Sequence, residues 1–393
     1  MSDGFPRELL QQPVASRLAY FKKYAVLHPK LKEAKEALLS AIQEPGGASI
    51  IFIFGPTFVG KTTLRLGVQK ELIEAALPSL ETDRGRIPVV GIELQPPETR
   101  NFSWKDYCTN ALIALEEPLI DYKINYDVRG ISRNNAGELI IQNRATAHDR
   151  RRALGNALSH RRPDIFFIDE AQHLAKIASG QKVKDQLDYI KSLANTTGVT
   201  HGLFGVYELK IFRNLSAQLS GRSLDIHFKR YDLKCEEDMR AFMRVVKSFQ
   251  YHLPLEETPK LLEHGDYLYF GTLGCIGLLK NWLLKALNAA LKEGAKTLTL
   301  KHLEAHAIST DKLKEMMEEI EEGEQLFVEK EEDRNWLRKA LGLAPIDAST
   351  SDNSTSKSGT SEPVTSAKPA TKGKVGKRKP KRDPVGVEDN AAS

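Results

Sequence analysis

The chain has 393 residues, is 41% hydrophobic and carries a formal net charge of +5. This length and composition suit one large globular domain, or a core domain with appendages. No apolar run is long enough to cross a bilayer, and the start MSDGFPRELLQQ lacks the apolar stretch of a secretory signal. We therefore expect a cytoplasmic protein without membrane contact. The three cysteines form no C-x-x-C pair, and we expect them to be reduced and buried.

The first half of the chain predicts an α/β fold. Residues 1–45 predict a helical lead-in, because apolar residues recur at helical spacing before EPGG interrupts the pattern. These apolar residues are Leu31, Ala34, Leu38 and Ile42. Residues 46–233 alternate helix-like stretches with the strand-like runs IIFIFG, IPVVGIEL, DIFFID, HGLFGVY and LDIHFKRY. This alternation predicts a parallel sheet that is covered by helices.

The remaining chain is divided by composition. Residues 234–310 are nearly all helical in pattern and predict a small helical lid. Residues 311–345 are rich in glutamate and predict an acidic helical extension with a solvated face. Residues 346–393 are rich in Ser, Thr, Lys and Pro and have few apolar side chains. We expect this basic tail to be disordered until something binds it.

The stretch GPTFVGKTT meets the pattern G-x-x-x-x-G-K-[ST] of a phosphate-binding loop. Its glycines let backbone N–H groups turn inward, and the helix that begins near Lys61 presents its positive end to phosphate. Lys61 is predicted to reach the outer phosphates and Thr62 to bind Mg²⁺. The sequence therefore predicts an ATP site with Mg²⁺. Its residues are Gly55, Pro56, Thr57, Phe58, Val59, Gly60, Lys61, Thr62 and Thr63.

A second acidic motif, PDIFFIDEAQHL, follows about a hundred residues later. Its apolar run places Asp169 at the carboxyl end of a buried strand, where α/β sheets bind their ligands. We expect Asp169 to hold Mg²⁺ and Glu170 to act as the general base that polarises the attacking water. The two motifs together predict an ATPase that converts ATP and water to ADP and phosphate.

Hydrolysis by such sites often needs an arginine from a neighbouring subunit. Arg213, Arg222 and Arg230 all follow the fourth strand-like run. Arg222 lies just ahead of the last strand-like run, so it is our preferred catalytic arginine, with Arg213 as the alternative. This prediction makes hydrolysis depend on assembly of a homo-oligomer.

Basic residues gather between positions 121 and 162. Residues 121–145 alternate apolar and polar side chains around NNAG, which predicts a basic hairpin inserted in the core. An arginine-rich helix, AHDRRRALGNALSHRR, follows. Such side chains contact DNA phosphates without reading sequence, although a solvated charged face is the alternative. The candidates are Lys123, Arg129, Arg133, Arg144, Arg150 and Arg151. The cluster KGKVGKRKPKR in the tail suits either DNA or a partner protein.

Several phrases between residues 20 and 310 carry a family resemblance: HPKLKEAKEALLSAI, IFIFGPTFVGKTTL, IFFIDEAQHL, LFGVYEL and GTLGCIGLLKNWLLKAL. With them the chain resembles the TniB/TnsC-type AAA+ ATPases, which regulate transposition in transposons that include CRISPR-associated elements. The resemblance implies that Val26, Leu27 and His28 border the adenine. His28 stands before Pro29, so it is equally suited to cap a helix.

The chain departs from this family at two positions. The polar sensor residue of the family falls on Val206, and the arginine of its lid falls on Leu278. Neither apolar side chain can bind phosphate, although Lys280 lies close enough in sequence to substitute. We therefore expect slow, conditional hydrolysis.

The resemblance implies an ATP-bound ring or helical filament on double-stranded DNA in the bacterial cytoplasm. This assembly would recruit transposase subunits, and hydrolysis would dismantle it. A site-specific target-selection protein or an RNA-guided complex would choose the target. Two other functions remain open: a replication initiator or helicase loader, and a signalling ATPase that does not bind DNA. An initiator would normally add a DNA-reading helix-turn-helix domain after the lid.

Overall fold

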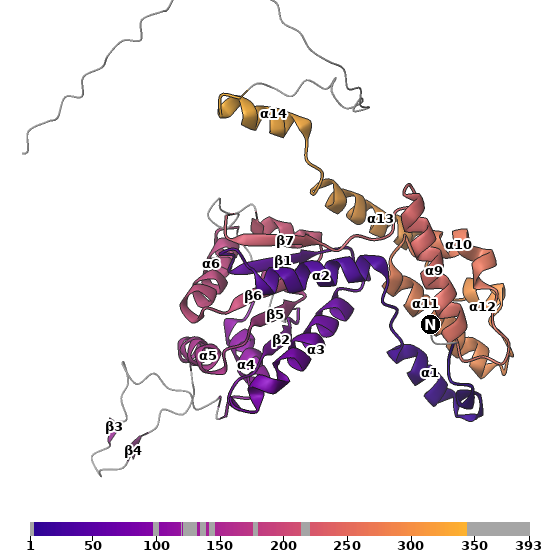
Figure 1. Ribbon diagram of the computed structural model, residues 1–393, viewed down its shortest axis with the longest axis horizontal. Helices are drawn as coiled ribbons and strands as arrows, with labels where there is room; N and C mark the ends of the chain where they lie inside the picture. Colours follow the sequence, from indigo (N-terminus) through magenta and orange to yellow (C-terminus); the bar gives the residue numbers. More distant parts are fainter. Residues whose placement is uncertain are drawn as a thin grey trace, which may run out of the picture. The chain divides into compact units, whose positions relative to one another are not determined.

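The computed structural model describes residues 4–96, 102–118, 120, 132–133, 139–140, 146–175, 180–213 and 221–343. The chain forms two compact units, Met1–Val328 and Glu329–Ser393. The first unit holds the sheet, the helices around it and the helical lid (Figure 1). The second contributes helix α14 (Glu331–Ala340), which has no buried residue. The predicted tail, 346–393, lies outside the described residues.

A five-stranded parallel sheet confirms the predicted α/β fold. Its strands, in the order β2-β5-β6-β1-β7, are β1 (Ile50–Phe54), β2 (Val89–Glu93), β5 (Ile165–Asp169), β6 (Thr200–Gly205) and β7 (Ser223–His227). The register places Ile53 opposite Phe204 of β6 and Ile226 of β7. Every residue of β1 and β5 is buried, because helices cover both faces of a parallel sheet. All five strand-like runs of the sequence form these strands.

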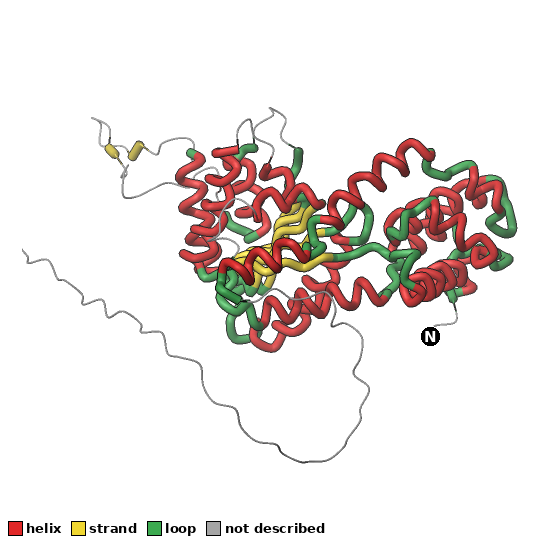
Figure 2. Tube along the Cα trace, turned by 90° about the horizontal axis from the view of Figure 1, so that it is seen from above, coloured by secondary structure: helices red, strands yellow, loops and turns green. Residues whose placement is uncertain are grey.

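Two helical layers enclose the sheet (Figures 1 and 2). Alternate residues of β1 point to opposite faces, so Phe52 and Ile53 enter different apolar cores. On the Ile53 side lie helices α2 (Pro29–Gln43) and α3 (Lys61–Leu80). On the Phe52 side lie α4 (Trp104–Ala114), α5 (Ala147–Arg161) and α6 (Gly180–Thr197). The helices thus bury the strand side chains and leave the strand ends for the site.

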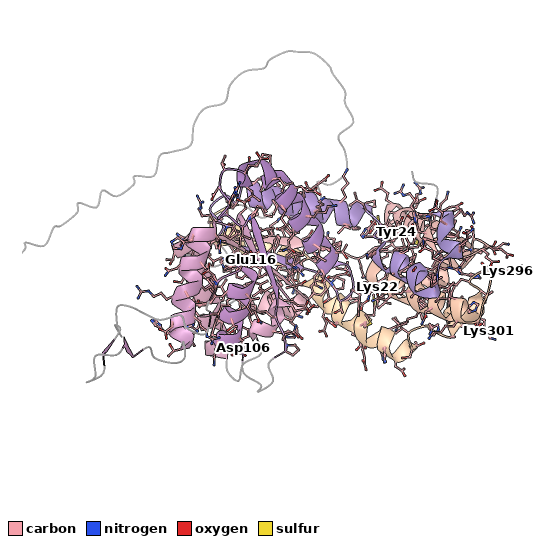
Figure 3. The ribbon with its side chains drawn as sticks, turned by 90° about the horizontal axis from the view of Figure 1, so that it is seen from below. Lys22, Tyr24, Asp106, Glu116, Lys296 and Lys301 are labelled. Carbon is pink, nitrogen blue, oxygen red and sulfur yellow. The ribbon has the colours of Figure 1, made fainter. Side chains whose placement is uncertain are left out.

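The region of the predicted helical lead-in, residues 1–45, contains several separate helical elements. Helix α2 packs on the core and buries Leu31, Ala34 and Leu38, as its spacing predicts. Helix α1 (Val14–Lys23) belongs instead with the lid, where Phe21 is fully buried. Figure 3 labels Tyr24, which follows α1; its ring stacks on His252 with centroids 3.8 Å apart. A short 3-10 helix, η1 (Arg7–Gln11), precedes α1.

The lid confirms the predicted helical pattern after the sheet. It consists of α9 (Glu236–His252), η5 (Leu261–His264), α10 (Gly265–Phe270), α11 (Ile276–Lys292) and α12 (Leu300–Glu304). Its apolar core centres on Phe242, Trp282 and Leu283. Cys108 of the core and Cys275 before α11 are buried, but Cys235 is exposed. The expectation of three buried cysteines was therefore wrong for Cys235, which stands just before the first residue of α9.

Helix α13 (Thr310–Gln325) extends the first unit beyond the predicted lid boundary at residue 310. Most of its glutamates are exposed, as expected for a solvated face. The opposite face, however, buries Leu313, Ile320 and Gly323. The segment therefore docks on the rest of the unit, because its few apolar residues share one side of the helix.

Three short elements follow the strand ends: η3 (Ala171–Ala175), η4 (Tyr207–Leu209) and α7 (Lys210–Arg213). Within the segment predicted as a hairpin, β3 (Ser132–Arg133) pairs antiparallel with β4 (Leu139–Ile140). The rest of residues 121–145 lies outside the described residues. Within the part of the chain that the structure describes, no helix is long and apolar enough to cross a membrane.

Candidate nucleotide-binding site

The phosphate-binding loop connects β1 to α3, and its carbonyl groups bind the side chain of Lys61. Gly60 adopts φ 116°, a left-handed conformation that favours glycine. Gly55 lies so close to the next segment that an added Cβ would approach the carbonyl oxygen of Phe228 to 2.6 Å. Lys61 Nζ donates hydrogen bonds of 2.9 Å to the carbonyls of Gly55 and Pro56. The loop thus encircles the ammonium group at the carboxyl end of a central strand.

The positive charge of Lys61 is only partly balanced by the acidic groups near it. Its side chain is buried, and this desolvation lowers its pKa to about 8, while the carboxylates of Glu170 and Asp169 act in the opposite direction. Glu319 of α13 is also among the charges that act on Lys61. Because burial disfavours the charged lysine, an anionic ligand beside it would be stabilised strongly.

Asp169 meets the loop from the end of β5. Thr62 Oγ1 donates to Asp169 Oδ2 at 3.1 Å, and the N–H of Glu170 donates to Asp169 Oδ1 at 3.0 Å. A hydroxyl and a carboxylate oxygen thus lie side by side, and both are hard oxygen donors of the type that Mg²⁺ prefers. Thr62 and Asp169 therefore fit the predicted magnesium site. Among the described residues no cluster of three or more His, Cys, Asp or Glu forms a separate metal site.

Arg65 is a site residue that the sequence reasoning missed. Its Nε donates to Asp169 Oδ2 at 3.0 Å, and Nη1 donates to Gln69 Oε1 at 2.9 Å. The side chains of Arg65 and Asp169 are only 10% and 2% exposed. Its position four residues after Lys61, on the same face of the helix, is a signal that could have found it.

Glu170 is held in an unusual backbone conformation, with φ 54°. For a residue with a side chain this left-handed conformation costs about 1–3 kcal/mol, and such strain tends to occur at functional sites. Gln172 Nε2 donates a hydrogen bond to Glu170 Oε2. The carboxylate of the predicted general base is therefore restrained by a buried amide from η3.

The segment predicted to border the adenine lies next to the loop, although its residues differ in exposure. His28 is buried, caps α2 by accepting from the N–H of Leu31, and its Nδ1 lies 3.0 Å from the Tyr231 hydroxyl. Burial lowers the pKa of His28 to about 4, so its ring is neutral. The ring of Phe228 lies between His28 and the loop, within 3.7 Å of a Cβ built on Gly60. Val26 is partly buried against the lid core, whereas Leu27 is 66% exposed.

The two predicted sensor positions both carry apolar side chains. Val206 precedes η4 and is partly buried. Leu278 of α11 is buried in a small cluster with Cys275 and Ile320. Lys280 is partly buried, and desolvation lowers its pKa.

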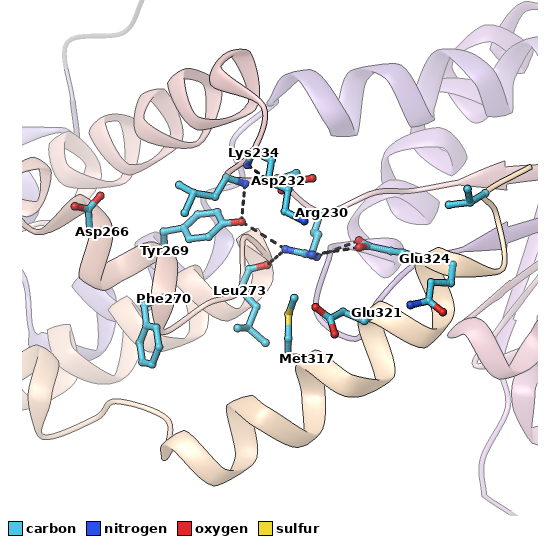
Figure 4. A pocket seen from close by; sticks show the side chains of 13 residues that line it. Arg230, Asp232, Lys234, Asp266, Tyr269, Phe270, Leu273, Met317, Glu321 and Glu324 are labelled. Atoms are coloured by element: carbon cyan, nitrogen blue, oxygen red, sulfur yellow. Dashed lines mark hydrogen bonds and ion pairs between the residues drawn. The ribbon is translucent and has the colours of Figure 1, made fainter. Parts of the chain in front are cut away.

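Helix α13 closes the junction between sheet and lid. Arg230, after β7, binds Glu324 of α13 through two hydrogen bonds of 3.0 and 3.1 Å. Its Nη1 also reaches the carbonyl of Leu273 and the hydroxyl of Tyr269 (Figure 4). These groups line a cavity of about 740 Å³ whose apolar wall includes Phe270. The cavity lies beside the lid and is separate from the phosphate loop.

The candidate arginines differ in their surroundings. Arg222 is exposed just before β7, and its carbonyl accepts from the N–H of Ser49. Arg213 ends α7, but its side chain lies outside the described residues. Arg230, the third arginine of this region, forms an ion pair with Glu324.

Two of the predicted DNA contacts have other partners. Arg150 is buried and donates to Thr109 of α4. Arg151 lies over the rings of Trp104 and Tyr189, 4.8 and 4.4 Å from their centroids. Both arginines pack α5 on its neighbours, which counts against the phosphate contacts predicted for them. Arg133 is placed in β3 by its backbone alone, and Lys123, Arg129 and Arg144 lie outside the described residues.

The strand order, with the loop after β1 and the acidic pair at the end of β5, defines the AAA+ P-loop ATPase fold. Residues 43–211 match the family model of the AAA domain. No curated protein matches the sequence.

Three solved structures have a similar chain path. The ORC2 protein of Aeropyrum pernix, in its ADP form, is 14% identical with a TM-score of 0.46, and the match covers 73% of this chain and 71% of that one. The Cdc6p protein of Pyrobaculum aerophilum is 14% identical with a TM-score of 0.44 and 88% coverage of both chains. The Walker-type ATPase paby2304 of Pyrococcus abyssi is 15% identical with a TM-score of 0.42, covering 78% of this chain and 80% of that one.

Proposed function

We propose that this protein is an AAA+ ATPase that assembles with ATP on double-stranded DNA and regulates transposition. The observation that carries the ATPase assignment is the convergence of Lys61, Thr62, Asp169 and Glu170 at the ends of two strands. Loop N–H groups and Lys61 would bind the phosphates, and Glu170 would orient the attacking water. When bound, Mg²⁺ neutralises charge on the β- and γ-phosphates.

Slow hydrolysis is part of the proposal. The apolar Val206 and Leu278 offer no group for the γ-phosphate, and Gln172 holds the carboxylate of Glu170. Placement of the water then depends on a change at Glu170, for which the strained backbone provides a driving force. A slow ATPase suits a regulator whose ATP-bound state must persist.

The proposed dependence of ATP hydrolysis on assembly rests on Arg222. Its side chain is exposed at the edge strand β7, where a neighbouring subunit can be reached without rearrangement of the core. We propose that it completes the site of an adjacent subunit in a ring or filament. Arg213 is the alternative.

DNA binding and transposition rest on the basic hairpin and on the family resemblance of the sequence. Lys123, Arg129, Arg133 and Arg144 are the proposed phosphate contacts. Transposase subunits and a target-selection protein or RNA-guided complex are the proposed partners. The preference for transposition over initiation rests on the family resemblance of the sequence.

Electron microscopy of the purified protein would test the proposal, with a nonhydrolysable ATP analogue in the presence and absence of duplex DNA. We expect rings or filaments that require both ligands. Binding should also weaken steeply with salt, by about 10³-fold or more between 50 and 200 mM if at least six phosphates are contacted. A protein that stays monomeric with both ligands would contradict the proposal. Stimulation of a replicative helicase, without any effect on transposase, would favour the initiator instead.

A further inference from the structure

We propose that Arg65 is a positioning residue that orients Asp169 and balances its charge before any metal binds. This inference rests on the proposed nucleotide-binding function. Arg65 Nε and Thr62 Oγ1 both donate to the same carboxylate oxygen, at 3.0 and 3.1 Å. The other oxygen accepts from the N–H of Glu170. Donors on both oxygens therefore fix the rotation of the carboxylate.

The surroundings of Arg65 show that this arrangement is built into the fold. Gly91 of β2 faces the guanidinium, and a Cβ at this position would lie 2.8 Å from Arg65 Nη1 and 2.6 Å from Gln69 Nε2. A larger residue at this position would have to displace the end of one or both side chains. Gln69 in turn accepts from Arg65, so the guanidinium is held at both ends.

The charges of Asp169 and Arg65 predict how nucleotide binding depends on Mg²⁺. A triphosphate placed on Lys61 comes close to the buried Asp169, and the two anions repel unless a cation lies between or beside them. In most such sites the metal supplies that cation, whereas here Arg65 already does. Nucleotide binding should therefore be nearly independent of Mg²⁺ in the wild-type protein, although hydrolysis still requires the metal.

Binding of a fluorescent ATP analogue with Mg²⁺ or with EDTA tests the inference. We expect wild-type affinities that agree within about threefold in the two buffers. R65Q should lose more than tenfold in EDTA and recover most of this loss in Mg²⁺. R65K, which keeps the charge, should stay close to the wild type. R86Q removes an arginine from the exposed Arg86–Asp164 pair and is the matched control.

The double variant R65Q/D169N leaves no unpaired charge and should bind in EDTA more tightly than R65Q. Thermal unfolding will show whether R65Q is folded, and if it is not, the double variant can still be measured. Equal losses for R65Q in both buffers would overturn the inference and leave Arg65 a structural residue. Absence of nucleotide binding by the wild type would instead contradict the proposed function.

A different observation supports a second inference: we infer that helix α13 is an autoinhibitory strap. Its apolar face bridges sheet and lid. Ile320 packs against Cys275 and Leu278, and Gly323 lies against the ring of Tyr207, where a Cβ would approach to 2.0 Å. Phe327, just after α13, stacks on His227 with centroids 4.3 Å apart.

The charge of the strap opposes nucleotide binding. Glu319 precedes Ile320, which packs with Leu278 next to Gly277, the lid residue that bonds the phosphate loop; its carboxylate is among the charges that act on Lys61. A triphosphate would place several negative charges beside this carboxylate, so seating of α13 and binding of ATP disfavour each other. Displacement of the strap by ATP would uncover Tyr207 and Arg230 for other contacts.

Two variants distinguish the effect of the Glu319 charge from the effect of the docking of α13. E319Q should raise affinity for the ATP analogue at least threefold while α13 stays seated. G323A places a methyl group against Tyr207 and should release α13, which limited proteolysis will report, with a similar or larger gain in affinity. E318Q, at the neighbouring exposed position, is the control for E319Q. Unchanged affinity in E319Q, or release of α13 in G323A without a gain, would overturn the inference.

Discussion

The backbone N–H of Gly277, in the first turn of lid helix α11, donates to the carbonyl of Phe58 in the phosphate loop at 2.9 Å. Phe58 itself has φ 62°, and its side chain is 47% exposed. The loop therefore reaches the lid through its backbone, so the loop conformation and the lid position are coupled.

Substitution of Gly277 should disrupt this contact. A Cβ here would lie 2.3 Å from the Phe58 oxygen, so G277A must shift either loop or lid. We expect a loss of about 1–3 kcal/mol in the free energy of unfolding, together with weaker nucleotide binding. G67A, in α3 where an added Cβ meets nothing within 4 Å, is the control and should stabilise the protein slightly. Identical behaviour of the two variants would exclude the coupling.

Because of Lys61, the folded protein should become more stable as the pH rises in the alkaline range. The folded pKa of Lys61, about 8, lies below the ordinary lysine pKa of 10.5, so the unfolded chain binds more protons between these two pH values and stability rises with pH. The gain is on the order of 3 kcal/mol in the absence of nucleotide. K61M should lack this slope and should not bind ATP, whereas K70M, on the exposed side of the same helix, should retain both properties. Chemical denaturation between pH 7 and 10.5 measures the difference.

E170Q should bind ATP normally and hydrolyse it about 10²–10⁴ times more slowly, because it removes the general base but keeps the shape. Steady-state phosphate release and analogue binding measure the two properties. A normal rate in E170Q would remove Glu170 from the proposed reaction.

R222A should lose turnover only in the assembled state. An equimolar mixture of R222A and K61M should regain part of the activity, since each K61M subunit supplies the arginine that its R222A neighbour lacks. R240A, on an exposed turn of the lid, is the control. Failure of the mixture to exceed its separate components would favour Arg213 or a role within one subunit.

His28 should make stability sensitive to acid. Burial lowers its folded pKa from 6.5 to about 4, so the folded state binds fewer protons and loses stability as the pH falls from 6.5 to 4. H28A should reduce this slope and, through loss of the cap on α2, cost about 1–2 kcal/mol at pH 7. H160A, at an exposed position of α5, should alter neither. Unfolding curves from pH 4 to 7.5 decide between the outcomes.

The sequence determined the local parts of this protein. The apolar runs predicted every strand of the sheet, since a strand buried on both faces must be continuously apolar. The spacing of Gly55, Gly60 and Lys61 predicted the loop, because its function depends on neighbouring backbone groups. The acidic pair at Asp169 followed from the strand before it.

Which distant side chains meet depends on tertiary packing. Arg65 reaches Asp169 across 104 residues, and Arg230 reaches Glu324 across 94, separations at which residue type alone specifies no partner. Arg150 and Arg151 resembled DNA contacts in the sequence, yet they pack α5 on its neighbours. Helix α13 looked solvated because glutamate dominates its composition, whereas a few apolar residues on one face suffice to dock a helix. Charge and composition are local properties, but burial is decided by the whole fold.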